Sequence, residues 1–317
     1  MPKLTQGNLN KIEIPCPDVA TQRGIVEALG SLDNRITLLR ETNQTLEAIA
    51  QAIFKSWFVD FDPVRAKMEG RQPVGMDEET AALFPDELVE SELGLIPKGW
   101  ETVSFSEFLT DTIGGDWGKD SPDIQHDQAV RIIRGTDFQD VRSGGGNKAP
   151  IRYTTTKKLI SRKLAPGDIV VEVSGGSPTQ PTGRSIFITH SLMDRFAEPL
   201  VCASFCRRFR PKNYGLGLLA YLHLQALYQA DGTWAYQNQS TGIANFQTTR
   251  FLRDELILRP PEPVVHLFVE QVSTLLSAAS SNLIQTLCDL RDTLLPRLIS
   301  GKLRVPVDET EAVTNED

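Results

Sequence analysis

Two stretches of the chain, residues 12–58 and 256–302, share one pattern of apolar positions and superpose without a gap at an offset of 244. Each opens with a short apolar run and a proline cluster and continues with apolar residues spaced alternately four and three apart. That spacing is the heptad seam of a coiled coil. The first seam comprises Ile25, Leu29, Leu32, Ile36, Leu39, Asn43, Leu46, Ala50, Ile53 and Trp57. The second seam holds Val269, Ser273, Leu276, Ser280, Leu283, Leu287, Leu290, Leu294, Arg297 and Gly301, and it frays at both ends.

Both stretches are expected to form long helices. Proline residues lie just before each helix start, where a missing N–H costs least, and Asp18 and Glu262 suit the positive end of each helix dipole. A helix of about 38 residues extends on the order of 57 Å, which is too long for an ordinary compact domain. We therefore expect the two helices to pair as an antiparallel coiled coil. A single surface helix wrapped on a globule is the rival interpretation, and it predicts a wider apolar stripe.

One polar residue, Asn43, interrupts the first seam. A buried asparagine commonly fixes the register or oligomer state of a coil at a cost in stability. A loosened, wet stretch of coil facing Leu287 is the alternative, and both interpretations remain open. The residues that we assign to the coil and to partner contacts are Leu32, Ile36, Leu39, Asn43, Leu46, Ile53, Leu276, Leu283, Leu287 and Leu290.

The sequence between the two helices has a different texture. Residues 60–98 are rich in proline, glycine and acids, and predict a linker with one short helix around residues 77–90. From Trp100 to about Leu258, short alternating runs such as AVRIIRG and GDIVVEVSGG are separated by turns, and residues 216–230 give the clearest helix. The expected fold class is therefore α+β, with a mixed domain built on a twisted β sheet and flanked by the two long helices.

Charge divides the chain in the same way. The net charge is −8, but residues 102–242 hold sixteen Lys and Arg against thirteen Asp and Glu, whereas residues 60–101 carry eleven acids and four bases. The local excess of bases suits a polyanion, although a solvated strand-and-turn face would look the same. The basic residues of this cluster are Arg131, Arg134, Arg142, Lys148, Arg152, Lys157, Lys158, Arg162 and Lys163.

Catalytic and metal-binding motifs are missing from the sequence. An amino-methyltransferase needs an Asn/Asp-Pro-Pro-aromatic loop, but the only Asp-Pro, at Asp62, is followed by Val64. A metal-dependent nuclease pairs an acid with Glu-x-Lys, and Ser174 stands two residues after Glu172 where lysine is needed. The four cysteines offer no zinc ligand set, which favours buried free thiols. We therefore expect a protein that is not an enzyme.

Three segments resemble a known family. They are NQTLEAIAQAIFKSWFVDFDPV at residues 43–64, ESELGLIPKGWE at 90–101 and DLRDTLLPRLISGKL at 289–303. Together they resemble the two conserved helical regions of the specificity subunits of type I restriction–modification systems and the start of their target-recognition domains. The resemblance frames nearly the whole chain. It departs from the family pattern before the first helix, where the residues resemble only the end of a first recognition domain, so we expect a shortened form with one complete recognition domain.

The resemblance implies a division of the chain and a set of partners. The helices would space recognition domains along double-stranded DNA and dock DNA methyltransferase subunits, with restriction subunits joining the complex and a second copy of the chain as a further candidate partner. No cofactor is implied in this chain, whereas S-adenosylmethionine, ATP and Mg²⁺ are implied for the partners. No membrane segment is recognisable, and we expect a cytoplasmic protein of a bacterium or archaeon. The expected regions are 1–15, a remnant of a first domain; 16–59, helix 1; 60–98, an acidic linker; 99–258, the recognition domain; 259–303, helix 2; and 304–317, an acidic disordered tail.

The candidate DNA-binding residues come from loop chemistry. Three loops within the expected recognition domain, GGDWGKDSPD, SGGSPTQPTGRS and YQNQSTGIANFQ, interrupt its strands. Arginine can pair with guanine, and glutamine or asparagine with adenine, whereas Ser and Thr suit phosphate, but ordinary hydrophilic turns have a similar composition. The residues we select are Lys119, Arg134, Gln180, Arg184, Gln237, Asn238 and Gln239. A coiled-coil scaffold that does not read DNA, or an inactive fragment, is the alternative.

Overall fold

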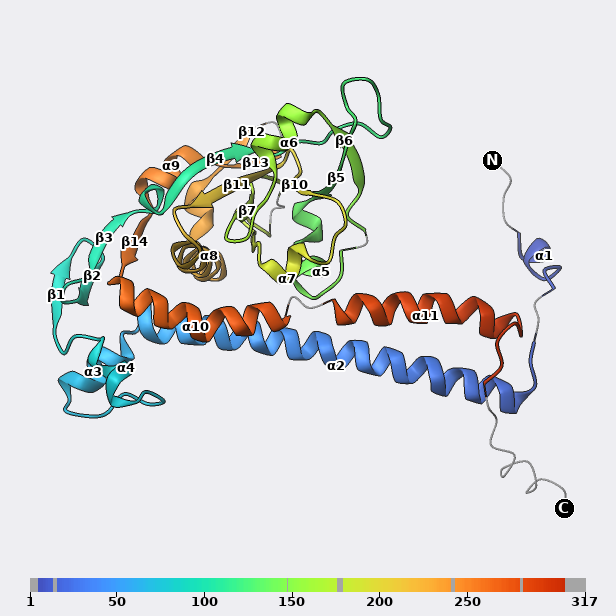
Figure 1. The fold of residues 1–317 in the computed structure, drawn as a ribbon, viewed down its shortest axis with the longest axis horizontal. Coiled ribbons are helices and arrows are strands. Elements are labelled where there is room, and N and C mark those ends of the chain that lie inside the picture. Colours follow the sequence, from blue (N-terminus) through green and yellow to red (C-terminus); the bar gives the residue numbers. More distant parts are fainter. Residues whose placement is uncertain are drawn as a thin grey trace, which may run out of the picture. The chain divides into compact units, whose positions relative to one another are not determined.

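The computed structural model describes residues 5–13, 16–146, 148–175, 179–240, 243–279 and 282–305, without the side chains of residues 239, 240 and 243. Helices and small sheets alternate along it, which confirms the α+β class (Figure 1). The chain divides into two compact units. One comprises Met1–Glu41 and Leu283–Asp317, and the other comprises Thr42–Asn282.

The unit of residues 1–41 and 283–317 is helical. It holds α1 (Gln6–Leu9), the first part of α2 (Val19–Phe58) and α11 (Leu283–Ile299). Asp18 precedes α2, and its carboxylate accepts a hydrogen bond from the backbone N–H of Thr21, which lowers the pKa of Asp18. Asp33 on α2 pairs with Arg291 on α11 at 2.9 Å, and Gly24 lies beside Val305. Earlier residues of α2 therefore contact later residues of the C-terminal segment, as antiparallel pairing requires.

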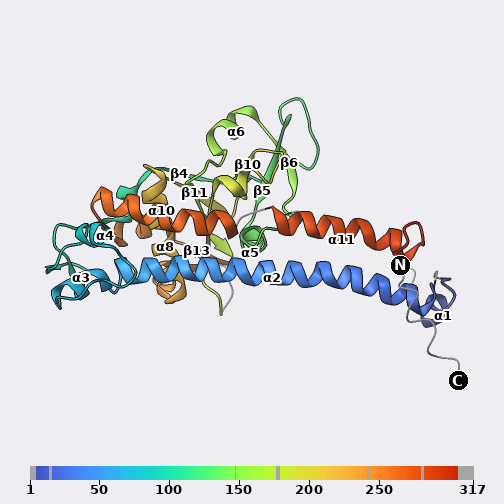
Figure 2. The same ribbon diagram turned by 60° about the horizontal axis from the view of Figure 1, so that its bottom comes forward.

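In the unit of residues 42–282, the end of α2 packs against α10 (Glu262–Ala279). The Phe268 ring lies 6.3 Å from that of Phe54, 5.8 Å from Trp57 and 4.9 Å from Phe58, and all four rings are buried. Figure 2 shows these helices side by side. The pairing is antiparallel here as well, so the packing of the two repeated stretches follows the sequence prediction in each unit.

The central sheet of this unit has the strand order β4-β11-β7-β9 and is antiparallel throughout. Its strands are β4 (Leu109–Gly114), β11 (Cys206–Pro211), β7 (Ile169–Glu172) and β9 (Ser185–Phe187). Side chains alternate between faces along a strand. Accordingly, Ile169 and Val171 join a core that contains the aromatic cluster, whereas Val170 joins a second core on the other face. The sheet is therefore covered on both sides.

Smaller sheets surround this one. The strands β10 (Leu200–Cys202), β5 (Gln128–Ile133) and β6 (Ile151–Thr154) form one sheet, and β12 (Gln237–Ser240), β13 (Ile243–Phe246) and β8 (Ser174–Gly175) form another. The strands β14 (Leu256–Arg259) and β3 (Glu101–Ser104) pair antiparallel. The predicted helix of residues 216–230 is α8 (Tyr214–Gln229), which contacts the central sheet and α10 (Figure 1). Shorter helices are α5 (Phe138–Arg142), α6 (Thr156–Arg162), α7 (His190–Met193) and α9 (Thr248–Asp254).

The region expected to be a linker carries more structure than its composition suggests. It forms α3 (Asp62–Met68), α4 (Glu78–Ala82) and a hairpin of β1 (Leu88–Ser91) and β2 (Gly94–Pro97). The expectation of one helix through residue 90 is wrong. Pro85 follows α4 closely, and a proline excludes the helical hydrogen bond that its N–H would make.

The second repeated stretch also differs from expectation. It forms two helices, α10 and α11, with residues 280 and 281 outside the described residues. On α11, Leu283 and Leu290 are 39% and 44% exposed, although we predicted both as seam positions, whereas Ile284 is 2% exposed. The prediction carried one heptad phase from Leu276 across a helix that in fact ends at Ala279. Ile284 thus replaces Leu283 on the inward face of α11, whereas Leu287 keeps its predicted place there.

The other predicted coil positions point inward. Ile36, Asn43 and Leu276 are buried, and Leu32, Leu39, Leu46, Ile53 and Leu287 are half-buried. Val26 and Leu38, which are not seam positions, are exposed.

Among the cysteines, Cys202 and Cys206 are buried free thiols, and burial raises the pKa of Cys202 to about 12. Cys16 is exposed, against expectation. No helix among the described residues is long and apolar enough to cross a membrane.

Candidate DNA-binding surface

One of the predicted residues, Arg184, is bound to the buried carboxylate of Glu172 at the end of β7. Arg184 donates two hydrogen bonds to Glu172, from Nε at 2.8 Å and from the terminal nitrogen at 2.7 Å. That pairing raises the pKa of the Arg184 guanidinium. A Cβ at Gly135 would lie 2.3 Å from Glu172 Oε1, so only glycine lets the backbone after Arg134 approach this close. The Glu172 carboxylate therefore joins segments far apart in the sequence.

A second group of polar contacts holds the amide side chains of the same region. Gln237, on β12, accepts hydrogen bonds at its Oε1 from the backbone N–H of Thr182 at 2.9 Å and from the Thr182 hydroxyl at 3.2 Å. Gln180 is exposed and interacts with the Tyr228 hydroxyl. Asn238 is exposed next to Gln237, whereas the Gln239 side chain lies outside the described residues. The structure thus brings Gln180, Arg184 and Gln237 together, with Asn238 beside them.

The Arg134 side chain is already paired within the turn that follows it. Its Nε and terminal nitrogen donate to Asp137 at 2.8 Å and 2.7 Å, and a further hydrogen bond reaches the Lys148 carbonyl at 3.0 Å. These bonds raise the pKa of Arg134. A guanidinium that is already paired bidentately has fewer N–H groups to offer a base.

Lys119 lies on a different loop, between β4 and β5. Its backbone exchanges two hydrogen bonds with Tyr153 on β6, and its ammonium donates to Asp123 at 2.6 Å. Asp123 also accepts the backbone N–H groups of Gln125 and His126, and the bond from Lys119 does most to lower the pKa of Asp123. This loop is ordered by its own contacts, away from the site around Glu172.

Much of the basic cluster seen in the sequence is neutralised in the fold. Arg131 pairs with Glu198 at 2.9 Å, Lys158 with Asp116 at 2.8 Å, and Arg152 pairs with Asp120 while lying over the Trp117 ring. Arg142 is half-buried beside Glu47 of α2. Lys148, Lys157 and Lys163 are exposed, and no ion pair is formed by them within the described part of the chain.

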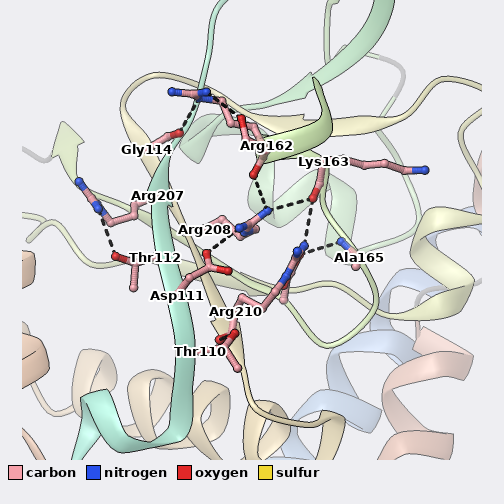
Figure 3. A network of polar contacts seen from close by, with 12 residues as sticks. Thr110, Asp111, Thr112, Gly114, Arg162, Lys163, Ala165, Arg207, Arg208 and Arg210 are labelled. Carbon is pink, nitrogen blue, oxygen red and sulfur yellow. Dashed lines mark hydrogen bonds and ion pairs between the residues drawn. The ribbon is translucent and has the colours of Figure 1, made fainter. Parts of the chain in front are cut away.

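Sequence reasoning missed the arginines of β11. Arg208 is buried and donates to Asp111 on β4 at 2.6 Å, whereas Arg210 binds Asp168 through two nitrogens at 2.9 Å and 2.8 Å (Figure 3). Arg207 donates to the Thr112 hydroxyl at 3.2 Å. The signal was the segment CRRFRP, with three arginines in six residues of a strand. Glu172, the carboxylate weighed for a nuclease motif, binds Arg184, and Asp168, which directly precedes the same strand, binds Arg210. The described residues include no group of three metal-ligating side chains.

These features define a class of protein: an α+β domain with basic and amide-rich loops, connected to antiparallel helices. Residues 1–48 match the family described as type I restriction modification DNA specificity domain. The type I restriction enzyme HindI specificity subunit of Haemophilus influenzae is 28% identical over 95% of this chain and 71% of its own length. The MjaIX specificity subunit of Methanocaldococcus jannaschii is 26% identical over 96% of this chain and 63% of its own length.

A solved type I restriction-modification S subunit from M. genitalium is 13% identical, with a TM-score of 0.45, over 89% of this chain and 61% of that one. The chain thus spans between three fifths and three quarters of the length of these proteins. The family model and both of these relatives describe specificity subunits of type I restriction–modification systems, and the chain is similar to the two relatives over almost its whole length.

Proposed function

We propose that this chain recognises a short sequence in double-stranded DNA and directs the methyltransferase and restriction subunits of a type I complex to it. The observation that carries the proposal is the surface beside Glu172, where Gln180 and Arg184 of one segment meet Gln237 of another, which is bound through Thr182 at a separation of 55 residues. Amide and guanidinium groups read base edges in the major groove. A position fixed in this way determines which adenine a partner methyltransferase can flip out and methylate.

The other predicted roles belong to the same proposal. Lys119, Arg134, Asn238 and Gln239 complete the DNA-contacting set, and the paired helices dock the methyltransferase subunits. The chain needs no cofactor of its own, whereas S-adenosylmethionine, ATP and Mg²⁺ serve its partners, and the complex acts on DNA in the cytoplasm. With a single recognition domain, a second copy of the chain would supply the other half of a bipartite target.

Selection from a random DNA library tests the proposal. The chain, assembled with its cognate methyltransferase, is expected to enrich one short motif, and its affinity should fall steeply with salt as phosphate counterions are released. Failure to enrich any motif at any salt concentration contradicts the proposal.

The alternative function is a scaffold that binds partners without reading DNA. It is favoured by the internal ion pairs of Arg134 and Arg184, which occupy N–H groups that a base would need. A scaffold would still assemble with the methyltransferase in a mass measurement, but the assembly would show no sequence preference in the selection.

A further inference from the structure

The short helix α6 (Thr156–Arg162) has an outer face without a partner among the described residues. Its Ile160 side chain is 77% exposed, although large apolar side chains elsewhere in the domain are mostly buried. Lys157, three residues before Ile160, shares its helix face, and Lys163, the C-cap residue just beyond the end of the helix, is exposed as well. In both views α6 lies on the side of its domain away from α10 (Figures 1 and 2). The helix α10 therefore leaves this face uncovered.

The inner side of α6 is fixed by polar contacts from several strands. Buried Arg208 donates to the carbonyls of Ser161 and Lys163 at 3.0 Å and 3.2 Å, and Arg210 donates to the Lys163 carbonyl at 3.1 Å (Figure 3). Arg162 returns a bond to the Gly114 carbonyl on β4 at 3.1 Å. These guanidinium groups satisfy carbonyls that a helix end leaves unpaired and place positive charge where the helix dipole favours it.

The other end of α6 is held equally firmly. The Thr155 hydroxyl accepts the backbone N–H of Lys158 at 3.2 Å as an N-cap, and the Lys158 ammonium binds Asp116 at 2.8 Å. Burial disfavours the charged form of Asp116, but bonds from Lys158 and Thr154 outweigh burial and lower its pKa. A helix pinned at both ends presents its outer side chains in one orientation, which lowers the entropy lost on binding.

The charges around this face select a polyanion. The nearby carboxylates Asp111, Asp116 and Asp168 are already paired with Arg208, Lys158 and Arg210. The Lys163 side chain points away from this network (Figure 3). Two lysines on either side of an apolar side chain match a major groove, whose phosphates lie along both edges and whose floor displays thymine methyl groups. A helix of seven residues is about 10.5 Å long, within the roughly 12 Å width of that groove.

We propose that α6 is a DNA-reading helix: Lys157 and Lys163 contact phosphates on either side of the major groove, and Ile160 packs against the methyl group of one thymine. This inference rests on the proposed function. It adds an apolar contact to a base, which the loop residues that hydrogen-bond base edges do not provide. Ile160 is then a specificity-determining residue for thymine.

Replacing single thymines of the selected motif by deoxyuridine tests the Ile160 contact, because only the methyl group is removed. For the unaltered complex, the replacement at one of these thymines should lower the DNA affinity about fourfold, which is the contribution of one buried methyl group. Ile160→Ala should be insensitive to the replacement at that same thymine. The matched control is Ile124→Ala, an equally small change at a fully exposed isoleucine of the 116–127 loop, which should keep the fourfold loss.

Salt titrations test the two lysines. Lys157→Ala and Lys163→Ala should each weaken binding to all sequences and reduce the slope of log affinity against log salt by about 0.9. Lys98→Ala, which removes a lysine paired with Glu87, should leave the slope unchanged.

Three outcomes overturn the inference. If no thymine shows a loss that Ile160→Ala abolishes, the reading contact is absent, although a motif enriched in the selection would still support the proposed function. Unchanged salt slopes in both lysine variants exclude the phosphate contacts. If these α6 variants lose methyltransferase binding in the absence of DNA, α6 contacts protein instead.

Discussion

The two copies of the repeated stretch diverge at one place. The first copy forms a single helix of 40 residues, α2, whereas the second copy forms α10 with 18 residues and α11 with 17. Aligned at the offset of 244, Ile36, Thr37 and Leu38 of the first copy correspond to Ser280, Ser281 and Asn282 of the second.

This difference separates two kinds of information in a heptad pattern. The pattern predicts that a helix exists and which face is apolar, but its phase holds only as long as the helix is continuous. Ile36 is buried within the unbroken α2, while Leu283 and Leu290 follow the interruption and are exposed. The variants below test how far each copy depends on its own packing.

The largest effect is expected at Phe268, where α10 meets the end of α2. Phe268→Ala removes a fully buried ring that contacts Phe54, Trp57 and Phe58, and should lower the free energy of unfolding by about 3–5 kcal/mol. Urea denaturation followed by tryptophan fluorescence measures it. Val74→Ala, at an almost fully exposed position, is the control and should change stability by less than about 0.5 kcal/mol. Equal losses in the two variants would rule out an aromatic core at this junction.

The phase of α11 can be tested with two neighbouring residues. Ile284→Ala should cost about 2–3 kcal/mol because Ile284 is buried, whereas Leu283→Ala should cost less than about 1 kcal/mol. The same denaturation measurement compares them directly. A larger cost at Leu283 would support the seam position predicted from the sequence and contradict the inward placement of Ile284.

A gain in stability is expected at Asn43. This residue is buried in α2, and its Nδ2 has no hydrogen-bond partner within the described part of the chain. Asn43→Leu should raise the free energy of unfolding by about 1 kcal/mol by removing an unsatisfied donor. If Asn43 also fixes the register of the coil, sedimentation should show additional oligomers in the variant. A loss of stability would indicate that the amide is satisfied in solution.

The smallest effect concerns pH and Glu47, on the part of α2 that faces α5. Burial raises the pKa of Glu47, and the Arg142 guanidinium, 4.0 Å away, offsets this only in part. The folded state therefore binds a proton more tightly than the unfolded state, and this contribution to stability is lost as pH rises from about 4.3 through the folded pKa.

Glu47→Gln removes that titration. The stability of the unaltered protein minus that of Glu47→Gln, measured by denaturation at several pH values, should fall as pH rises toward neutrality. The exposed Glu90→Gln serves as control and should give a flat difference. A difference that rises with pH for Glu47 would mean that its pairing with Arg142 outweighs burial.

Local patterns in the sequence predicted the helices well, but they did not predict which charged side chains pair with one another. The course of α2, the position of α8 and the inward face around Ile36 follow from periodicity, because each depends on residues three or four apart. The charge of the basic cluster depends instead on partners such as Glu198 for Arg131 and Asp116 for Lys158, which are 67 and 42 residues away. Such pairs are set by strand order, which periodicity does not specify.

The candidate site likewise has a part that the sequence predicted and a part that it did not. Loop composition found Gln180, Arg184 and Gln237, but not the partners that hold two of them: Glu172 binds Arg184, and Thr182 binds Gln237. Gly135 also lies against the Glu172 carboxylate, a contact that the sequence pattern does not specify.

Methylation-aware sequencing tests target recognition most directly. Cells without other adenine methylation would express the cognate methyltransferase alone, with this chain, and with a hybrid in which residues 99–258 come from a related specificity subunit. Target recognition by this domain predicts no methylated motif with the methyltransferase alone, one motif with this chain, and a different motif with the hybrid. The same motif in all three strains, or none with this chain, would contradict it.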